Sequence, residues 1–247
     1  MPSRRSSLLL AAPVVLLVVA LAIIAGLSPK PGSMPLATPT PEPTYAAPAA
    51  PPVGVAEPAS ESIADLVDEE WLIATAARTG IPVRALSAYA GAALWKATQM
   101  PACGISWNTL AAIGYVESRH GSYGGAVIAA DGEISPPIYG VALAGGSTQH
   151  IPDSDNGKFD KDKQYDRAIG PMQMIPESWK NWRTDANADH HRDPHNMFDA
   201  VMAAANYLCR ASPDMVGEPG WRAGIASYNS APSYLHAVAR AAIEYAG

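Results

Sequence analysis

Apolar and polar positions divide the chain into four stretches of different character. A basic stub, residues 1–7, precedes an uncharged and mostly apolar run, residues 8–27. Residues 28–60 are rich in Pro, Ala, Ser and Thr, and over residues 61–247 apolar residues recur at helical spacing. This pattern predicts a membrane-spanning helix, a tether and one folded domain.

The run 8–27 is long enough to cross a bilayer, because twenty helical residues span about 30 Å. Arg4 and Arg5 precede it and favour a cytoplasmic N-terminus, so we expect the domain on the outer side of the cell membrane. The alternative is a cleaved signal peptide and a secreted domain, although the apolar core of such a peptide is usually shorter. Residues 28–60 cannot bury enough apolar surface to fold, which predicts a disordered, stiff tether.

The folded part is predicted to be mainly α-helical. Gly80 and Gly121 mark helix ends, Pro82 suits the first turn of a helix, and Ser106 is a good N-cap. Alternating β-patterns are nearly absent, and residues 121–170 are rich in loops. The helices are expected at 62–78, 82–97, 107–120, 176–182, 196–211, 221–229 and 232–246.

Composition narrows the classes of function. The chain of 247 residues has a net charge of −6 and no basic stripe, which excludes a nucleic-acid binder. Cys103 and Cys209 are its two cysteines, and both fall in the part expected outside the cell. An oxidising compartment makes a disulfide between them the simplest prediction, with two free buried thiols as the alternative.

The expected helix 107–120 carries a carboxylate on its apolar face. Leu110, Ile113 and Gly114 form the apolar stripe, and Glu117 follows at the spacing of the next core position. A buried carboxyl stays protonated to a higher pH than usual, as a general acid requires. The alternatives are an ion pair with a core Arg, or a place at the helix end where the stripe meets solvent.

Three further segments suit carbohydrate binding. Glycines within 121–125 let the chain leave the helix of Glu117 tightly, and AIGPMQMIPESW (168–179) places a Gly-Pro turn before a Pro-initiated helix. ASYNS (226–230) follows, with Tyr234 beyond it. Amides can bond to hydroxyl and N-acetyl groups, and aromatic rings can cover the C–H face of a sugar.

Together these residues resemble the lytic transglycosylases of bacterial cell walls, in particular the murein transglycosylase B type with its goose-lysozyme-like helical domain. The resemblance covers about residues 80–247 and follows the order of the family's motifs, which here read IPVRALSAYAGAA, ESRHG, AIGPMQMIP, NMFDAVMAAANYL and SYNSAPSY. It implies Glu117 as the catalytic acid/base, and Gln173, Tyr228 and Asn229 as residues of the substrate groove. From the same segments, we expect Gly170, Met172 and Tyr234 to bind substrate as well.

One departure from the family concerns the residues after Asn229. The family usually has a polar residue and then Ser there, whereas this chain has Ser230 and Ala231. A small hydrogen bond of the family is therefore expected to be missing.

The resemblance also implies the reaction. Most glycosidases use two carboxylates, whereas this family works with one. Glu117 would protonate the leaving oxygen of the MurNAc–GlcNAc β-1,4 bond and then activate the C6 hydroxyl of the same sugar, which gives a 1,6-anhydro end. The partner is peptidoglycan, and no cofactor is required. The alternatives are lysozyme-like hydrolysis, with Asp131, Glu133 or Asp166 orienting water, and a catalytically idle wall-binding scaffold.

Two acidic loops are candidates for metal binding. The loop 185–196 begins like a calcium loop, with Asp185, Asn187, Asp189 and Asp193 at positions 1, 3, 5 and 9, but His190 and Asn196 replace the usual Gly and Glu. A solvated or degenerate loop is therefore the first prediction, and structural calcium is the alternative. The Asp-rich stretch 153–166 fits no EF-hand and predicts a solvated loop, with weak cation binding as its alternative. The histidines of 190–195 lack the context of a zinc site.

Overall fold

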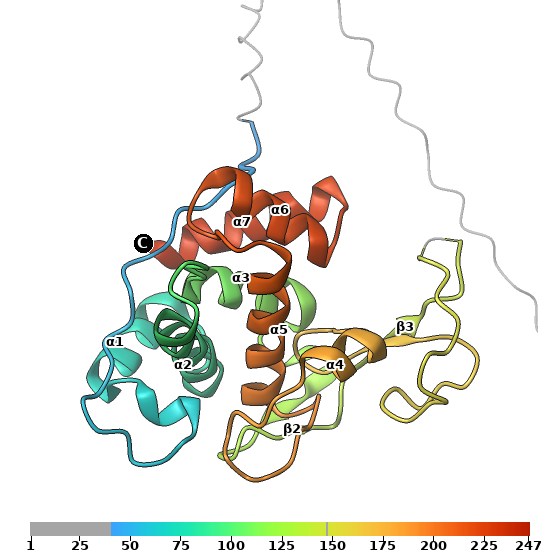
Figure 1. The fold of residues 1–247 in the computed structure, drawn as a ribbon, viewed down its shortest axis with the longest axis horizontal. Coiled ribbons are helices and arrows are strands. Elements are labelled where there is room, and N and C mark those ends of the chain that lie inside the picture. Colours follow the sequence, from blue (N-terminus) through green and yellow to red (C-terminus); the bar gives the residue numbers. More distant parts are fainter. Residues whose placement is uncertain (1–40, 147) are drawn as a thin grey trace, which may run out of the picture. The chain divides into compact units, whose positions relative to one another are not determined.

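The computed structural model describes residues 41–146 and 148–247, and most regular structure in this part is helical, as predicted (Figure 1). Two 3-10 turns, η1 (Ile63–Leu66) and η2 (Tyr123–Gly125), accompany the α-helices. These are α1 (Glu69–Thr79), α2 (Val83–Gln99), α3 (Trp107–Ser118), α4 (Pro176–Trp182), α5 (Met197–Ala211), α6 (Glu218–Tyr228) and α7 (Pro232–Ala246). The strands are β1 (Val127–Ile128), β2 (Ile134–Ser135), β3 (Tyr139–Ala142) and β4 (Arg167–Ile169).

The predicted membrane helix 8–27 lies outside the described residues, as do the stub before it and the first part of the tether, 28–40. Among the residues that the structure does describe, no helix combines the length and the apolar character needed to cross a membrane.

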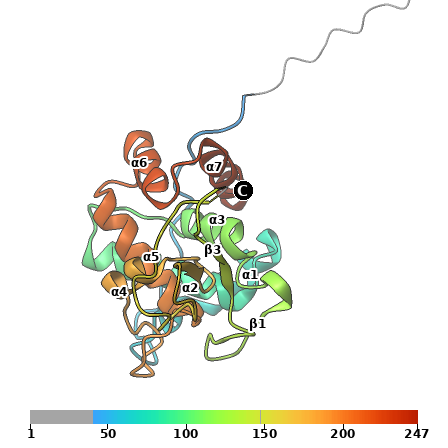
Figure 2. The same cartoon turned by 90° about the vertical axis from the view of Figure 1, so that its right-hand side faces the viewer.

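Helices α2, α3 and α5 make up the centre of the core. α2 packs against both α3 and α5, and α7 packs along α3 (Figures 1 and 2). Small residues permit this close approach: Ala111 and Ala112 of α3 are fully buried, and a side chain at Gly114 would collide with the hydroxyl of Tyr89 on α2. The helix that carries Glu117 is therefore held by neighbours on more than one side.

Several predicted helix ends are confirmed. Gly80 follows α1 in a left-handed conformation, with φ of 71°. Pro176 and Pro232 open α4 and α7, whose bounds match the prediction. Other bounds differ by one to three residues. Pro82 is the N-cap of α2, which continues to Gln99, and α3 stops at Ser118; α5 begins at Met197, and α6 spans Glu218–Tyr228.

The prediction of one helix over 62–78 is wrong. After η1 the chain is extended at Val67, and α1 begins only after Asp68. Asp68 caps α1 by accepting a hydrogen bond from the N–H of Trp71 at 2.9 Å, while Val67 pairs with Gly54 in a β-bridge. The expected helix is therefore interrupted, because Val67 pairs with a residue distant in sequence and Asp68 caps a new helix.

The prediction that a disordered tether extends to residue 60 is also wrong, because residues 41–60 pack on the domain. We call residues 41–50 the strap; in Figure 1 it is drawn in blue and runs past α7 toward α1. Ala46 is only 1% exposed, and the indole N–H of Trp107 donates to the carbonyl of Ala50 at 2.9 Å. The folded unit therefore begins at Pro41 instead of at residue 61.

The buried amide of Asn108, on α3, fastens the strap to two helices. It donates to the carbonyl of Ala47 at 3.1 Å and to that of Ala242, on α7, at 3.0 Å, and it accepts from the N–H of Ala49 at 3.0 Å. An extended Pro-rich backbone has no internal hydrogen bonds. Its free N–H and C=O groups are thus available to side chains of the domain.

The loop-rich middle of the chain contains two antiparallel strand pairs that the sequence pattern did not predict. β1 pairs with β2, and β3 pairs with β4. We call residues 143–166, which connect β3 to β4, the hairpin loop. Its turns depend on carboxylates: Asp153 accepts hydrogen bonds from three backbone N–H groups, and Asp166 accepts from the N–H and the hydroxyl of Ser154.

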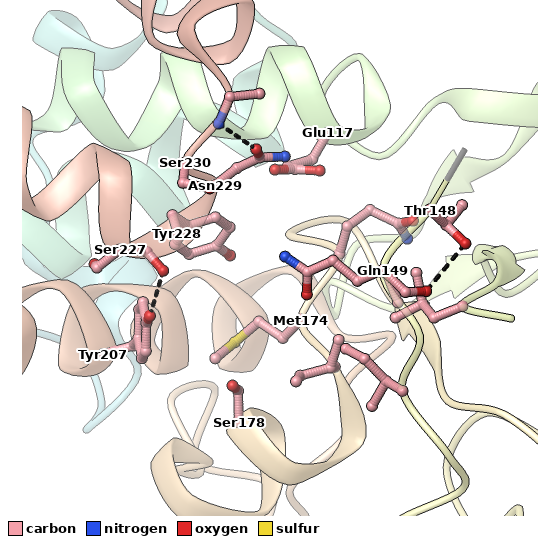
Figure 3. Close-up of a pocket in the computed structure, with 16 residues that line it drawn as sticks. Glu117, Thr148, Gln149, Met174, Ser178, Tyr207, Ser227, Tyr228, Asn229 and Ser230 are labelled. Carbon is pink, nitrogen blue, oxygen red and sulfur yellow. Dashed lines mark hydrogen bonds between the residues drawn. The ribbon is translucent and has the colours of Figure 1, made fainter. Parts of the chain in front are cut away.

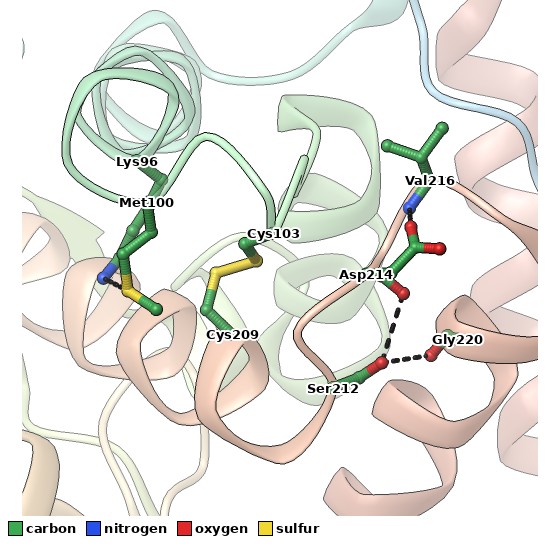
Figure 4. Close-up of a disulfide and its surroundings, with 8 residues drawn as sticks. All are labelled: Lys96, Met100, Cys103, Cys209, Ser212, Asp214, Val216 and Gly220. Carbon is green, nitrogen blue, oxygen red and sulfur yellow. Dashed lines mark hydrogen bonds between the residues drawn. A yellow bond between two sulfur atoms is a disulfide. The ribbon is translucent and has the colours of Figure 1, made fainter.

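The predicted disulfide joins Cys103 and Cys209 (Figure 4). Cys103 lies in the connection between α2 and α3, and Cys209 lies near the end of α5. Both are buried, and the bond links the segment before α3 to the end of α5.

Candidate active site

Glu117 lies in the last turn of α3, half-buried at a cavity of about 740 Å³ (Figure 3). This volume suits a ligand of several hundred daltons. The cavity is bordered by the hairpin loop, by the start of α4, by α5, and by the connection between α6 and α7. Its lining residues are Glu117, Leu143, Thr148, Gln149, Ile151, Ala168, Gln173, Met174, Ile175, Ser178, Tyr207, Ser227, Tyr228, Asn229, Ser230 and Ala231.

The carboxyl of Glu117 titrates near neutral pH. Burial raises its pKa from 4.5 to about 7, and the hydrogen bond from Tyr234 acts in the opposite direction. The hydroxyl of Tyr234, on α7, donates to Oε1 of Glu117 at 2.6 Å. No salt bridge in the described part of the chain includes Glu117, so the alternative of a core Arg partner does not apply. A carboxyl with this pKa can donate a proton and later take one back.

The end of α3 is connected to the Gly170–Gln173 turn. The three residues after Ser118 all have positive φ, so the chain leaves the helix directly beyond Glu117. The hydroxyl of Ser118 donates to the carbonyl of Pro171 at 2.7 Å and accepts from the N–H of Gly121 at 2.7 Å. Ser118 is 1% exposed, which makes this link a buried one.

The turn itself places the amide of Gln173 at the cavity. Gly170 and Gln173 have φ of 71° and 48°, and a side chain at position 170 would collide with the carbonyl of Pro194. Nε2 of Gln173 donates to the carbonyl of Gly170 at 2.8 Å. This bond fixes the amide and leaves its Oε1 to accept a hydrogen bond from a ligand.

Tyr228 and Asn229 border the cavity where α6 ends. The hydroxyl of Tyr228 donates to the carbonyl of Met172 at 2.7 Å, which ties α6 to the Gly170–Gln173 turn. Oδ1 of Asn229 accepts from the N–H of Ala231 at 3.0 Å. The Nδ2 group of Asn229 therefore remains as a donor for a ligand.

The sequence analysis missed a large part of the cavity wall. Figure 3 shows Thr148 and Gln149 on one side and Tyr207 and Tyr228 on the other. The rings of Tyr207 and Tyr228 pack edge to face with their centroids 5.7 Å apart, and the hydroxyl of Tyr207 donates to the carbonyl of Ser227. Tyr207 belongs to one of the quoted family segments, whereas Thr148 and Gln149 belong to no motif that the sequence analysis identified.

Three of the expected substrate-binding residues do not line the cavity. Met172 is fully buried and contributes its backbone carbonyl. Gly170 shapes the turn, and Tyr234 contacts Glu117 from α7. These three residues therefore hold the lining residues in place and do not themselves face the cavity.

The carboxylates considered for orienting water also lie elsewhere. Asp131 and Glu133 are exposed on a turn, where Asp131 accepts from the N–H of Glu133 at 3.1 Å. Asp166 is fully buried in the hairpin loop. Among the described residues that line the cavity, Glu117 is the one carboxylate.

The residues considered for calcium bind mainly within their own loop. Asp185 and Asp193 accept hydrogen bonds from backbone N–H groups of the loop 185–196, and Asn187 donates to Asp189 at 2.8 Å. These contacts close turns and bring no three carboxylates together.

A different set of acids does converge. Carboxylate oxygens of Asp153, Asp155 and Asp166 lie within 4.8 Å of one another in the hairpin loop. Each of the three also accepts hydrogen bonds from neighbouring N–H groups. Calcium at the loop 185–196 and weak cation binding at 153–166 stay the alternatives to the solvated loops that the sequence predicts.

Comparison with known protein families gives one match. The family model of the transglycosylase SLT domain matches residues 157–224, which include the Gly170–Gln173 turn and α4 to α5 but neither Glu117 nor α7. Searches of curated proteins and of solved structures give no significant match. The matched segment supports a domain of the lytic transglycosylase type, with peptidoglycan as its substrate.

Proposed function

We propose that the protein is a peptidoglycan lytic transglycosylase that cleaves the MurNAc–GlcNAc β-1,4 bond and leaves a 1,6-anhydro-MurNAc end. The observation that carries this proposal is the environment of Glu117. Its carboxyl is half-buried at a cavity of sugar-binding character, has a pKa of about 7, and is held by Tyr234. These are the properties of a group that acts first as an acid and then as a base.

In the first step, protonated Glu117 donates to the glycosidic oxygen, and the bond to carbon 1 of the muramoyl unit breaks. In the second step, the resulting carboxylate takes the proton of the C6 hydroxyl as that oxygen attacks carbon 1. The proton returns to Glu117, so one carboxyl completes the cycle. Because the nucleophile belongs to the substrate, correct positioning supplies a large part of the rate.

The composition of the cavity favours this mechanism over hydrolysis. Glycosidases with two carboxylates place them about 5–9.5 Å apart on opposite sides of the bond. The described lining residues offer no second carboxylate to pair with Glu117. Oε1 of Gln173 and Nδ2 of Asn229 are suited to bind hydroxyl and N-acetyl groups, and the Tyr207–Tyr228 pair is suited to pack on a sugar ring.

The location of the enzyme is part of the proposal. With residues 8–27 as a membrane anchor, the catalytic domain would act on the wall from the outer face of the cell membrane; a secreted form is the alternative.

Analysis of the products tests the proposal. Purified residues 41–247 are incubated with peptidoglycan, and the released muropeptides are examined by mass spectrometry. Products lighter by one water than the hydrolysis products support transglycosylation, whereas reducing ends indicate the lysozyme-like reaction. Intact glycan strands, with the protein bound to them, would instead support a scaffold. Glu117→Gln is the matched inactive control, because it keeps the shape of the side chain and removes the titrating group.

A further inference from the structure

Directly after α3, a buried histidine lies between two tyrosines of different helices. His120 is only 6% exposed. Its Nδ1 lies 3.1 Å from the hydroxyl oxygen of Tyr89, on α2, and its Nε2 lies 3.0 Å from the hydroxyl oxygen of Tyr245, on α7. A neutral imidazole offers one donor and one acceptor, and a phenol can serve as either, so both contacts can be hydrogen bonds at the same time.

His120 also closes the helical turn that carries Glu117. Its N–H donates to the carbonyl of Gly114 at 3.0 Å, across the last turn of α3. The hydroxyl of Tyr89 lies so close to Gly114 that a side chain at this position would collide with it. His120 therefore connects the end of α3 both to α2 and to α7.

Two tyrosines of α7 hold the end of α3. Tyr234 and Tyr245 are separated by about three helical turns, which places them on one face of α7. The hydroxyl of Tyr234 donates to Oε1 of Glu117 at 2.6 Å, and the hydroxyl of Tyr245 contacts His120. Because α7 packs along α3, these two contacts fix the position of one helix on the other.

We propose that His120 is a positioning residue for Glu117, because it fastens α7 to the end of α3 and so keeps the hydroxyl of Tyr234 on the carboxyl. His120 is not among the residues that line the cavity, so it acts through Tyr245 and α7. The inference rests on the proposed function for its effect on catalysis. The hydrogen bond that it concerns can be measured without any substrate.

The titration of Glu117 reports whether this hydrogen bond is intact. The bond from Tyr234 lowers the pKa of the carboxyl, against the effect of burial. The other ionisable group that faces Glu117 is the phenol of Tyr228, on α6. A shift of α7 away from the carboxyl should therefore raise the pKa of Glu117 further.

Ionisation of His120 does not overlap with this titration. Burial lowers the pKa of the imidazole to about 4, and the guanidinium of Arg119 acts in the same direction. The remaining ionisable groups that face the ring are the phenols of Tyr89, Tyr115 and Tyr245. A carboxyl at the end of α3 that titrates near pH 7 is therefore Glu117.

Substitution of the two connecting side chains tests the proposal. Tyr245→Phe removes one hydroxyl, and His120→Phe removes both ring nitrogens but keeps an aromatic ring. In the folded unit 41–247, carbon-13 NMR follows the side-chain carboxyl of Glu117, whose signal is assigned by its loss in Glu117→Gln. We expect each substitution to raise the titration midpoint by about 0.5–1 pH unit, as the loss of one hydrogen bond would. If His120→Phe does not fold, Tyr245→Phe decides the question alone.

Two further variants make the test specific. The double variant Tyr234→Phe with Tyr245→Phe should titrate at the same pH as Tyr234→Phe alone, because both changes act on one hydrogen bond. Arg78→Met is the matched control, since Arg78 donates to the carbonyl of Tyr245 at 3.1 Å and holds the same end of α7 from α1. This control should lower stability and leave the midpoint of Glu117 unchanged.

The positioning role would be overturned by an unchanged midpoint in Tyr245→Phe, by shifts that add in the double variant, or by an equal shift in Arg78→Met. On peptidoglycan, Tyr245→Phe should lower kcat several-fold and leave KM unchanged, because it affects the carboxyl and not the groups suited to bind sugar. Native protein without activity on peptidoglycan would contradict the proposed function, whereas the NMR result would still decide the role of His120.

Discussion

Burial of Glu117 affects the stability of the protein and, in the proposed mechanism, its activity. The folded protein holds the proton of Glu117 up to about pH 7, whereas an unfolded chain releases it near pH 4.5. Between these values the folded state binds more protons, so the free energy of unfolding falls as the pH rises through this window. A functional carboxyl at this position therefore lowers stability at neutral and alkaline pH.

Glu117→Gln should separate these two effects. Activity on peptidoglycan should fall about 100- to 10,000-fold, the range of a general acid–base contribution. The variant should also gain stability relative to the native protein, by up to about 3 kcal/mol at pH 8, because it lacks the ionising group. Denaturant unfolding of both proteins between pH 4 and pH 8 measures this difference. The other buried acids with raised pKa values, Asp160 and Asp199, are present in both proteins, so their contributions cancel. A difference in stability that stays constant over this range would contradict the assignment.

Tyr234→Phe should move the titration of Glu117. The hydrogen bond from Tyr234 lowers the pKa of the carboxyl, so its loss should raise that pKa further and shift the alkaline limb of the kcat/KM profile to higher pH. Stability should fall by about 1 kcal/mol. If the alkaline limb of the kcat/KM profile keeps its position or shifts to lower pH, Tyr234 does not act through Glu117.

Single residues were predictable to different degrees. The helical period indicates Glu117, because a carboxylate interrupts an apolar stripe. It cannot indicate that Tyr234, 117 positions away, donates to it, since this contact depends on how α7 packs along α3. Local turn signals similarly place Gln173 near a turn, but the orientation of its amide depends on the left-handed backbone and on the carbonyl of Gly170.

At the scale of elements, the strap and α3 form a unit that holds the site. Asn108 connects the strap, α3 and α7, and the latter two helices carry Glu117 and Tyr234. The strap therefore contributes to the geometry of the Glu117 carboxyl, although it lies outside the cavity wall.

Asn108→Ala should destabilise the protein by about 2–4 kcal/mol, because it removes a fully buried side chain with its buried bond to α7 and its two part-buried bonds to the strap. Thermal and denaturant unfolding measure the loss. Gln99→Ala, at an exposed site near the end of α2, is the control and should change stability by less than about 0.5 kcal/mol. Equal effects of the two substitutions would mean that the strap is not fastened through Asn108.

Elements with strong local signals were predicted well, and those that depend on distant partners were not. Pro232 at the start of a periodic segment was enough to locate α7. The break at Val67 was missed because it requires the bridge to Gly54, and the strap was missed because its order depends on side chains such as Asn108. The strand pairs of the middle region are too short to show alternation in the sequence.

At the scale of the whole molecule, the Cys103–Cys209 bond closes a long loop, whose ends are 106 positions apart in the sequence. In the chain-entropy account, such a cross-link stabilises the folded state by up to about 4–5 kcal/mol. Reductant should therefore lower the melting temperature of the native protein. The double variant Cys103→Ser with Cys209→Ser should melt at the lower temperature whether or not reductant is present. Native protein that melts at the same temperature in both conditions would contradict this contribution.

The attachment of the strap limits how far the enzyme can work from its expected anchor. Residues 41–60 belong to the folded unit. If residues 8–27 span the membrane, only residues 28–40 remain as a spacer between the membrane and the domain. A fully extended spacer of this length would reach about 40 Å at about 3.1 Å per residue, whereas a spacer up to residue 60 would reach about 100 Å. With the proposed activity and anchor, we therefore expect cleavage to be confined to the layer of the wall nearest the membrane.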